Sequence, residues 1–542
     1  MQQRITINLN TDSKKTDKTT ILEYCRIHGI AGIETPCGGK GTCGKCKVTV
    51  TKPYYKDVLA CQTKICDGME IIVGRKESTG TKEDSMVVLT NGGSISEKFN
   101  EHVNRNVVLK EETANESEKV ESNEDTLAAC DIGTTTVVCY LIDKETGQII
   151  STRSGANPQR SFGADVLSRI DAAARADDND KANGGLQMMQ TQIVSLLNGW
   201  ISEMLTECGR TKVSRFSVAG NTVMCHLLMG ISPEKLGKAP FLPDEYFGRE
   251  FNPLDIGLEN CQTMIIFPAV SGFVGGDITA GMMETVNCNE LTLYLDIGTN
   301  GEMALGKGDR YVCCATAAGP AFEGAQIELG MPASKGAVDK VWLEGRRIKY
   351  SVIGNDRPVG LCGSGLIDAL AVLLKAGIID ENGTILSGQE LPILFRSYVF
   401  EVEAEVASQS TESSLAVHIA PGVYITQEDI RKLQLAKGAI AAGIEVLFKE
   451  YGCKPCDLDI LTFAGGFGNY IDKASAAAIG LFPQELLDKA KEVGNAAGNG
   501  AVSAALSQEA WKRALDISGN MRYIELASYP HFNEMYVEHM NF

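Results

Sequence analysis

The stretch LTLYLDIGTNGEMALG, residues 291–306, places a polar turn between two apolar runs. The first run ends at Asp296, and Gly298, Thr299 and Asn300 follow in the turn. Apolar runs separated by a glycine-containing turn predict a β-hairpin. A glycine lets the backbone approach a ligand closely, and successive N–H groups with a threonine hydroxyl can bind an anion. The stretch therefore predicts a hairpin whose turn binds phosphate.

A second copy of this pattern occurs earlier, in TLAACDIGTTTVVCYLID, residues 126–143. Asp131 again ends an apolar strand, and Gly133, Thr134 and Thr135 form the turn. The two aspartates can hold a hydrated Mg²⁺ ion. Neither the P-loop pattern nor a strand-led G-x-G-x-x-G occurs in the chain, so the two turns are the predicted phosphate site. Facing one another, they would hold a triphosphate from both sides.

The two turns are followed by LTFAGGFG, residues 461–468. In this order the three segments resemble the first phosphate, second phosphate and adenosine motifs of the acetate-kinase, sugar-kinase, Hsp70 and actin superfamily. The resemblance implies a two-lobed actin-like (RNase H-like) ATPase that binds ATP and Mg²⁺. It assigns phosphate binding to Gly133, Thr134, Thr135, Gly298, Thr299 and Asn300, metal binding to Asp131 and Asp296, and nucleoside binding to Gly465, Gly466 and Gly468. Glu302 either orients the attacking water or is a solvated strand residue.

Near the N-terminus, TPCGGKGTCGKCKVTV (35–50) and VLACQT (58–63) contain four cysteines in the pattern C-x5-C-x2-C-x14-C. Glycines between the cysteines let the backbone curl so that N–H groups face anionic sulfur. The pattern resembles [2Fe-2S] ferredoxins of the plant and adrenodoxin kind, although the first spacing is one residue longer than in plant ferredoxins. The resemblance makes the ligands Cys37, Cys43, Cys46 and Cys61. Zinc is the alternative metal, but zinc knuckles usually offer two C-x2-C pairs and only one is present.

Strand and helix signals around these cysteines predict a small β-grasp domain. The segment KEETANESEKVESNED, residues 110–125, has seven acidic residues, two lysines and almost no large apolar side chain. It therefore cannot bury enough apolar surface to offset the conformational entropy that it would lose on ordering. It predicts a flexible linker. Beyond it, strands alternate with helical stretches, an α/β pattern. We divide the chain into a ferredoxin-like domain (1–80), an acidic linker (81–125), a middle domain with the first phosphate motif (126–210) and an actin-like ATPase domain (211–542), giving α/β and α+β domains in one chain.

Charge and hydropathy exclude several classes of protein. The net charge of −18 argues against nucleic acid as a partner, because binding phosphate backbones needs clustered Lys and Arg. Residues 1–80 are nevertheless basic, with 13 Lys and Arg against 8 Asp and Glu. No apolar run approaches the roughly 18–20 residues that span a bilayer. The N-terminus lacks the pattern of an export signal, and seventeen cysteines favour thiols and metal ligands, so we expect a cytoplasmic protein.

Taken together with NPQRSFGADVLSRI (157–170) and SVAGNTVMCHLLMG (217–230), the three motif sets resemble the ATP-dependent reductive activators of corrinoid proteins along nearly the whole chain. This resemblance implies that one electron passes from a [2Fe-2S] cluster to cob(II)alamin in a partner methyl-transfer protein, giving cob(I)alamin with ATP hydrolysis. It also implies an upstream low-potential electron donor and a homodimer. The alternatives are an activator of radical dehydratases, which by resemblance lacks a ferredoxin module, and a small-molecule kinase whose cluster senses redox state.

Overall fold

The computed structural model describes residues 3–7, 19–27, 30, 33, 35, 38–41, 45–53, 55–73, 126–174, 184–298, 300–324, 326–403, 413–465 and 471–542. These residues fall into two compact units. The first contains the described residues up to 280 together with 497–515, and the second contains residues 281–496 and 516–542. The predicted linker, 81–125, lies outside the described residues. None of the described helices has the length and apolar character needed to cross a bilayer.

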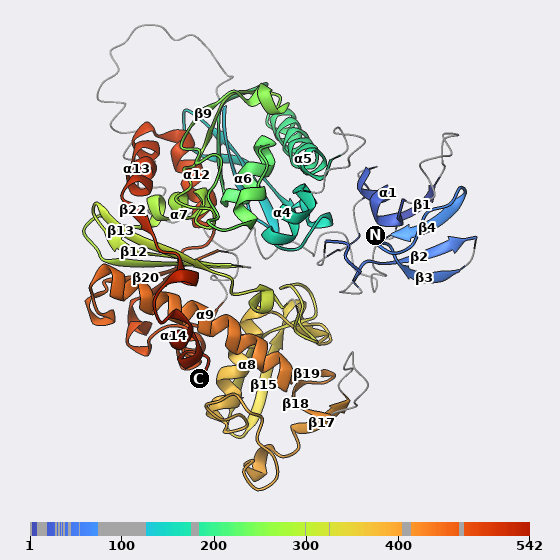
Figure 1. The fold of residues 1–542 in the computed structure, drawn as a ribbon, viewed down its shortest axis with the longest axis vertical. Coiled ribbons are helices and arrows are strands. Elements are labelled where there is room, and N and C mark those ends of the chain that lie inside the picture. The colour runs from blue at the N-terminus through green and yellow to red at the C-terminus, as the bar shows by residue number, and fades with distance from the viewer. Residues whose placement is uncertain are drawn as a thin grey trace. The chain divides into compact units, whose positions relative to one another are not determined.

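A four-stranded sheet and one helix form the N-terminal part of the first unit, labelled at N in Figure 1. Its elements are β1 (Gln3–Ile7), α1 (Ile21–Ile27), β2 (Lys47–Lys52), β3 (Lys56–Leu59) and β4 (Met69–Val73), with strand order β1-β4-β2-β3. Alternate residues of β2 and β4 are buried, and Ile21 of α1 is buried among them. This small sheet with its helix confirms the predicted ferredoxin-like domain.

A six-stranded sheet forms the rest of the first unit, in the order β7-β6-β5-β8-β10-β9. Its strands are β5 (Thr126–Ile132), β6 (Thr136–Asp143), β7 (Ile149–Ala156), β8 (Val213–Gly220), β9 (Arg249–Phe251) and β10 (Cys261–Ile266). Its helices are α4 (Val166–Ala174), α5 (Gly185–Glu207) and α6 (Thr222–Met229), with the first half of α7 (Gly276–Thr285) and most of α12 (Ala496–Leu506) and α13 (Gln508–Gly519). The boundary that we placed between residues 210 and 211 falls just before β8, inside this sheet.

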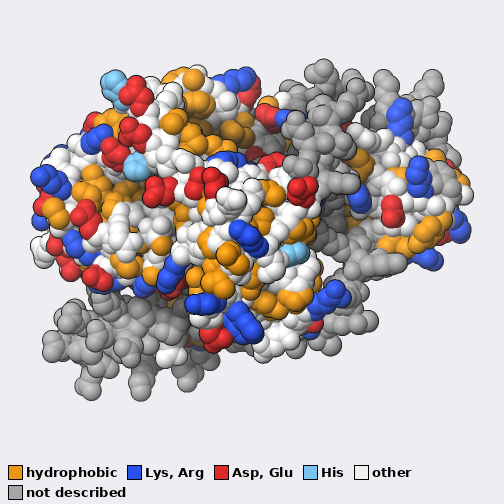
Figure 2. All heavy atoms as spheres, turned by 90° about the horizontal axis from the view of Figure 1, so that it is seen from below, with side chains coloured by type: hydrophobic (Ala, Val, Ile, Leu, Met, Phe, Trp, Pro, Cys, Tyr) orange, Lys and Arg blue, Asp and Glu red, His pale blue; other side chains and the backbone are white. Residues whose placement is uncertain are grey.

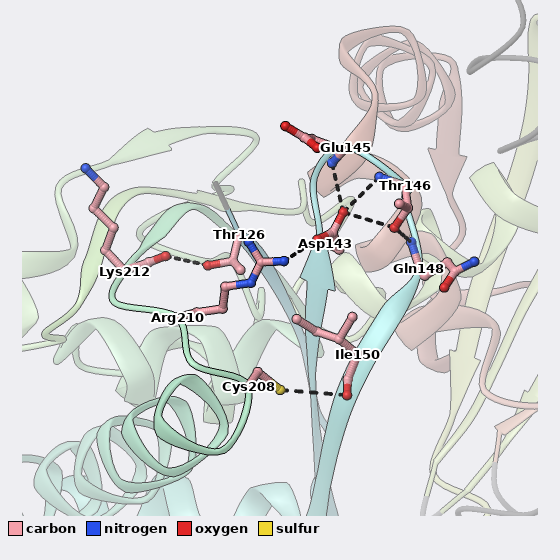
Figure 3. Close-up of polar contacts among 9 residues, drawn as sticks. All are labelled: Thr126, Asp143, Glu145, Thr146, Gln148, Ile150, Cys208, Arg210 and Lys212. Carbon is pink, nitrogen blue, oxygen red and sulfur yellow. Dashed lines mark hydrogen bonds and ion pairs between the residues drawn. The ribbon is translucent and has the colours of Figure 1, made fainter. Parts of the chain in front are cut away.

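Hydrogen bonds and an ion pair connect the turn between β6 and β7 and the start of β5 to residues 210 and 212, just before β8 (Figure 3). Asp143 accepts hydrogen bonds from the backbone of Glu145 and Thr146 in the turn, and Arg210 forms an ion pair with it at 2.5 Å. Burial would raise the pKa of Asp143, but the hydrogen bonds from Thr146 and the charge of Arg210 outweigh burial, so its pKa is lowered. The Thr126 hydroxyl donates to the Lys212 carbonyl, which joins β5 to the entry of β8. The strand that leads into the first phosphate turn is thus held at its far end.

The second unit contains another six-stranded sheet, in the order β21-β20-β11-β12-β13-β22. Its strands are β11 (Thr292–Ile297), β12 (Gly301–Lys307), β13 (Arg310–Thr316), β20 (Ile460–Ala464), β21 (Ala490–Glu492) and β22 (Met521–Tyr523). Like β5, the strand β11 is antiparallel to the next strand of its hairpin and parallel to a strand on its other side. The orders β7-β6-β5-β8-β10 and β13-β12-β11-β20-β21 repeat the same directions. The two phosphate hairpins therefore occupy equivalent places in two equivalent sheets.

Two smaller three-stranded sheets and several helices complete the second unit. The strands are β14 (Ala337–Glu344), β15 (Arg347–Val352), β16 (Gly360–Leu361), β17 (Val399–Glu403), β18 (Ser413–Ala420) and β19 (Val423–Thr426), and the helices are α8 (Gly363–Lys375), α9 (Gln427–Tyr451), α11 (Lys473–Ala478) and α14 (Phe532–Glu538). The long helix α9 packs against β12 and β13 (Figure 1). It begins with a capping box, in which the Thr426 hydroxyl accepts from the Asp429 N–H and the Asp429 carboxylate accepts from the Thr426 N–H, both at 3.1 Å. The repeated sheets and their helices confirm the predicted actin-like architecture.

A buried histidine beneath the first sheet predicts a measurable pH dependence of stability. His226 of α6 is fully buried, its Nδ1 lies 2.7 Å from the Thr222 carbonyl, and its Nε2 has no hydrogen-bond partner. Burial lowers the pKa of His226 below its ordinary value of 6.5, and the opposing charges of Asp244 and Glu245 are weaker. The folded state therefore binds the proton less tightly than the unfolded state, so stability is full above pH 6.5 and is lost as the pH falls below it.

We expect His226→Leu to remove this loss. Thermal unfolding gives a melting temperature for the wild type and for the variant at each pH. The difference between the two melting temperatures should narrow or reverse from pH 7.5 to pH 5.5, by about 2–4 °C for each kcal/mol of proton-linked destabilisation of the wild type. His226→Gln, which does not titrate, should follow the leucine variant in its pH dependence. Equal shifts of all three melting temperatures with pH would contradict the assignment.

Candidate functional site

Two of the four predicted cluster ligands lie within the described residues, and their sulfur atoms converge. Cys46 directly precedes β2 and Cys61 follows β3, and the antiparallel pairing of these strands places Lys47 opposite Leu59. The two Sγ atoms lie 3.2 Å apart, and neither cysteine forms a disulfide. Cys37 and Cys43 lie outside the described residues, and the remaining described side chains form no group of three metal-binding residues.

The loop between the cysteines has the backbone that an iron–sulfur site needs. Gly38, Gly39 and Gly41 have φ angles of 63°, 89° and 81°, a region that favours glycine because a Cβ would be strained there. Cys46 is only 2% exposed, so its sulfur lies in a largely apolar site. Converging thiols on a left-handed glycine loop fit the ligand chemistry of a [2Fe-2S] cluster.

The surface of this domain carries mainly basic side chains. Figure 2 shows more Lys and Arg than Asp and Glu on the face of the iron–sulfur domain at its right. Lys45 and Lys47 flank Cys46 and are exposed, and the exposed Lys40 forms an ion pair with Asp171 at 2.9 Å. A positive surface beside an electron-transfer site favours association with acidic surfaces and makes it depend on ionic strength.

The first phosphate turn joins β5 and β6 at the end of a central strand. The Gly133 N–H donates to the Thr136 carbonyl at 2.9 Å, which closes the turn. A Cβ on Gly133 would lie 2.8 Å from that carbonyl oxygen, so the position requires glycine. The backbone of Gly133, Thr134 and Thr135 is partly exposed, and Asp131 pairs with β6 on one side and β8 on the other. These residues can present N–H and hydroxyl donors beside a carboxylate.

The second turn repeats this arrangement between β11 and β12. The Gly298 N–H donates to the Asn300 carbonyl at 2.9 Å, and the Asn300 amide donates to the Glu302 carboxylate at 3.3 Å. Asp296 and Glu302 are directly paired across the two strands, so their side chains share one face of the sheet. Thr299 lies outside the described residues. Two carboxylates on one face, next to the turn, can hold a hydrated cation and orient a water molecule.

The third motif touches the second at one glycine. Gly465 follows β20, which is parallel to β11, and has a φ angle of 83°. A Cβ on Gly465 would lie 2.4 Å from Oδ1 of Asp296, so only glycine permits the observed approach. Gly466 and Gly468 lie outside the described residues. The structure thus brings Asp296, Glu302 and Gly465 together at the ends of neighbouring strands.

Several residues that contact the first turn were not assigned roles from the sequence. The Asn157 amide donates to the Gly133 carbonyl at 2.8 Å, the Asn221 amide donates to the Thr134 hydroxyl at 3.0 Å, and the Arg169 guanidinium donates to the Thr134 carbonyl. The segments 157–170 and 217–230 were noted as family features, and this was the one signal available.

Asp277 is a further carboxyl group that the sequence did not reveal. It lies in the first turn of α7, and burial raises its pKa to about 6. Burial, then the charges of Asp277 and Asp131, raise the pKa of the Cys225 thiol. A Cβ on Gly275, two residues before Asp277, would lie 2.5 Å from the Cα of Asn221, whose amide donates to the Thr134 hydroxyl. Asp277 is therefore a second acidic group close to the first phosphate turn.

A ferredoxin-like domain in one chain with two matching strand–turn–strand phosphate motifs defines an iron–sulfur protein with an actin-like ATPase. Comparisons with protein families agree with each part. Residues 7–66 match the 2Fe-2S iron-sulfur cluster binding domain, residues 127–287 the RACo middle region, and residues 290–542 the C-terminal domain of RACo, the ASKHA domain.

Two of the relatives found match nearly the whole chain, and a third matches two thirds of it. The chain is 33% identical to the corrinoid activation enzyme RamQ of Eubacterium limosum, over 96% of both chains. A [Co(II) methylated amine-specific corrinoid protein] reductase of Methanosarcina barkeri is 27% identical over 66% of this chain and 65% of its own. The solved structure of a reductive activator for corrinoid, iron-sulfur protein aligns over 97% of this chain and 96% of its own, with 29% identity and a TM-score of 0.66. The chain belongs to the family of reductive activators of corrinoid proteins.

Proposed function

We propose that this protein uses ATP to reduce the cob(II)alamin of a partner corrinoid protein to cob(I)alamin, with one electron carried by its [2Fe-2S] cluster. The observation that carries the proposal is that a cysteine loop and two phosphate turns occur in one chain that matches a corrinoid activation enzyme over 96% of its length. A second subunit in a homodimer and an upstream low-potential electron donor belong to the same proposal.

The energetics explain why an electron carrier is joined to an ATPase. Plant-type [2Fe-2S] centres have potentials near −400 mV, and Co(I) formation needs a stronger reductant than that. For one electron about 59 mV is a factor of ten, so a gap of ~200 mV costs about 4.6 kcal/mol. A ligand that binds one of two states ~10⁴-fold more tightly supplies about 5.5 kcal/mol. Nucleotide binding is therefore sufficient to make the transfer favourable, and hydrolysis makes the cycle irreversible.

The ATPase roles fall to the residues at the ends of the central strands. Asp131 and Asp296 hold the hydrated Mg²⁺, and Gly133, Thr134, Thr135, Gly298, Thr299 and Asn300 bind the phosphates. The Asn300 amide, which donates to Glu302, holds that carboxylate beside Asp296, where it orients the attacking water. Gly465, Gly466 and Gly468 pack beneath the nucleoside.

The iron–sulfur domain supplies the electron carrier. A bound [2Fe-2S] cluster would accept and release one electron at low potential. Cys37, Cys43, Cys46 and Cys61 hold it, and burial of Cys46 limits the access of water to that sulfur. Exposed Lys45 and Lys47 guide docking onto acidic surfaces.

The decisive experiment mixes anaerobically purified protein, a low-potential reductant, Mg-ATP and candidate corrinoid proteins, and follows the cobalt absorption bands. We expect Co(I) to form with at least one corrinoid protein and only when ATP is present. Absence of Co(I) with every candidate, or equal formation without ATP, would overturn the proposal. Phosphoryl transfer to a metabolite without any corrinoid protein would instead identify a kinase.

A further inference from the structure

A buried arginine, Arg169, contacts the first phosphate turn and forms no ion pair within the part of the chain that the structure describes. Arg169 of α4 is fully buried, and its guanidinium donates to the carbonyls of Gly163 and Thr134 and to the sulfur of Met224. No carboxylate of the described residues lies within ion-pair distance of it. Burial, together with the charge of Arg160, lowers the pKa of Arg169 to about 9 against the weaker opposing charge of Asp165, so the group is still cationic at neutral pH.

An unpaired buried charge is costly, and its position suggests what balances it. Burying a cation is costly, and hydrogen bonds to neutral acceptors compensate less than a nearby anion would. The Arg169 guanidinium contacts the Thr134 carbonyl, on the turn that is predicted to bind phosphate. An anion bound at that turn would supply the missing negative charge. Arg169 is therefore placed to respond when phosphate binds.

The segment that carries Arg169 also holds the first turn at two other points. Asn157 donates to the Gly133 carbonyl, and its own backbone N–H donates to the Thr135 carbonyl at 2.9 Å. The side chain of Asn157 also begins the short helix η2 (Pro158–Ser161) by accepting from the Gln159 N–H. The conformation of η2 and α4 is thus tied to the conformation of the phosphate turn.

The same segment is the contact site of the iron–sulfur domain within the first unit. Arg26 donates from Nε at 2.8 Å and from a terminal nitrogen at 2.5 Å to the Ser161 carbonyl, and its guanidinium lies 4.8 Å from the ring centroid of Phe162. The Thr35 hydroxyl donates to the same carbonyl at 2.7 Å. These contacts fall one and two residues before Gly163, whose carbonyl accepts from Arg169.

The cysteine loop itself also lies against this segment. A Cβ on Gly38 would lie 3.2 Å from the Phe162 carbonyl oxygen, and the Lys40 ammonium pairs with Asp171 of α4. Residues 157–174 therefore contact the phosphate turn at Gly133, Thr134 and Thr135 and the iron–sulfur loop at Gly38 and Lys40.

We propose that residues 157–174 couple phosphate binding at the first turn to docking of the iron–sulfur domain, with Arg169 as the positioning residue. The inference rests on the proposed ATP binding at that turn. Docking holds the Ser161–Gly163 backbone, which holds Arg169 against Thr134, so a docked chain loses less freedom when phosphate binds. The coupling is positive, and linkage requires that nucleotide strengthen docking by the same factor.

The test measures binding of the non-hydrolysable analogue AMP-PNP with Mg²⁺ to full-length, cluster-containing protein by calorimetry. Lys40→Glu should weaken AMP-PNP binding about threefold, because an exposed ion pair contributes weakly and its reversal adds repulsion. Lys56→Glu is the matched control, since Lys56 is an exposed lysine of β3 in the same domain, and it should leave affinity unchanged. The double variant Lys40→Glu/Asp171→Lys should restore the wild-type affinity for AMP-PNP. Visible absorption checks that each variant retains its cluster.

A double-mutant cycle separates coupling from simple destabilisation. Arg169→Lys should weaken AMP-PNP binding about tenfold, and in that background Lys40→Glu should have no further effect. Additive effects, or no effect of Lys40→Glu alone, would overturn the coupling while leaving ATP binding intact. Failure of the wild type to bind AMP-PNP would instead overturn the proposed function. If Arg169→Lys does not fold, the AMP-PNP affinities of Lys40→Glu and of the charge-swapped double variant still test the coupling.

Discussion

Cys46→Ser is expected to reduce Co(I) formation to the background rate while the protein remains able to bind AMP-PNP. The Cys46 sulfur lies 3.2 Å from that of Cys61 and is almost fully buried. A serine hydroxyl is a poor substitute for a thiolate ligand of iron, so the cluster should be lost or fail to assemble. Iron content, visible absorption and the cobalt bands measure the loss, and calorimetry with AMP-PNP measures the binding that remains.

The matched control is Cys25→Ala in the same domain. Cys25 is also almost fully buried, and burial raises the pKa of its thiol to about 11, which disfavours the thiolate that a metal needs. This variant should keep the cluster and lose only a modest amount of stability. Retention of the cluster by Cys46→Ser, or its loss in Cys25→Ala, would contradict the ligand assignment.

Asp296→Ala is expected to lose ATP hydrolysis and to keep its iron–sulfur cluster. The carboxylate lies at the end of β11, opposite Glu302 and against Gly465, where it can hold the Mg²⁺ that accompanies ATP. Loss of a metal ligand removes several kcal/mol of transition-state stabilisation, so ATP hydrolysis should fall by on the order of 100-fold or more. Co(I) formation should fall with it, while iron content and the cluster spectrum stay as in the wild type.

Asp309→Ala serves as the control for Asp296→Ala. Asp309 is an exposed aspartate in the turn between β12 and β13 of the same sheet, away from the strand ends that carry the motifs. It should hydrolyse ATP at the wild-type rate. Full ATPase activity in Asp296→Ala, or equal loss in both variants, would show that the carboxylate has no special role.

Much of the local structure could be predicted because its causes are local. The hairpins at 126–143 and 291–306 follow from apolar runs on either side of a short polar turn, and both occur. The start of α9 follows from Thr426 and Asp429, whose side chains each satisfy the other's backbone N–H. The small sheet around the cysteines was predicted from local strand and helix signals, whereas the actin-like fold was implied by the resemblance of its three motifs to a known superfamily.

The support of the site could not be predicted, because it depends on residues that are distant in the chain. Arg169 lies in the segment 157–170 that resembles the family, but its role depends on the carbonyl of Thr134, 35 residues away. Asn221 donates to the same residue from 87 positions further along. In the sequence, Asp277 is an ordinary acidic residue at the start of a helix. Only the folded structure buries it, and burial raises its pKa to about 6.

By itself the sequence determined which chemistry the chain can hold: four cysteines with iron–sulfur spacing, and two aspartates that each precede a glycine–threonine turn. Those features depend on residue type and short spacing, which the chain specifies directly. Only the tertiary structure decided that the two hairpins occupy equivalent strands, and that residues 157–174 touch both the phosphate turn and the iron–sulfur loop. The reason is physical, because contacts between distant segments arise from the packing of whole sheets and helices and leave no periodic signal in the sequence.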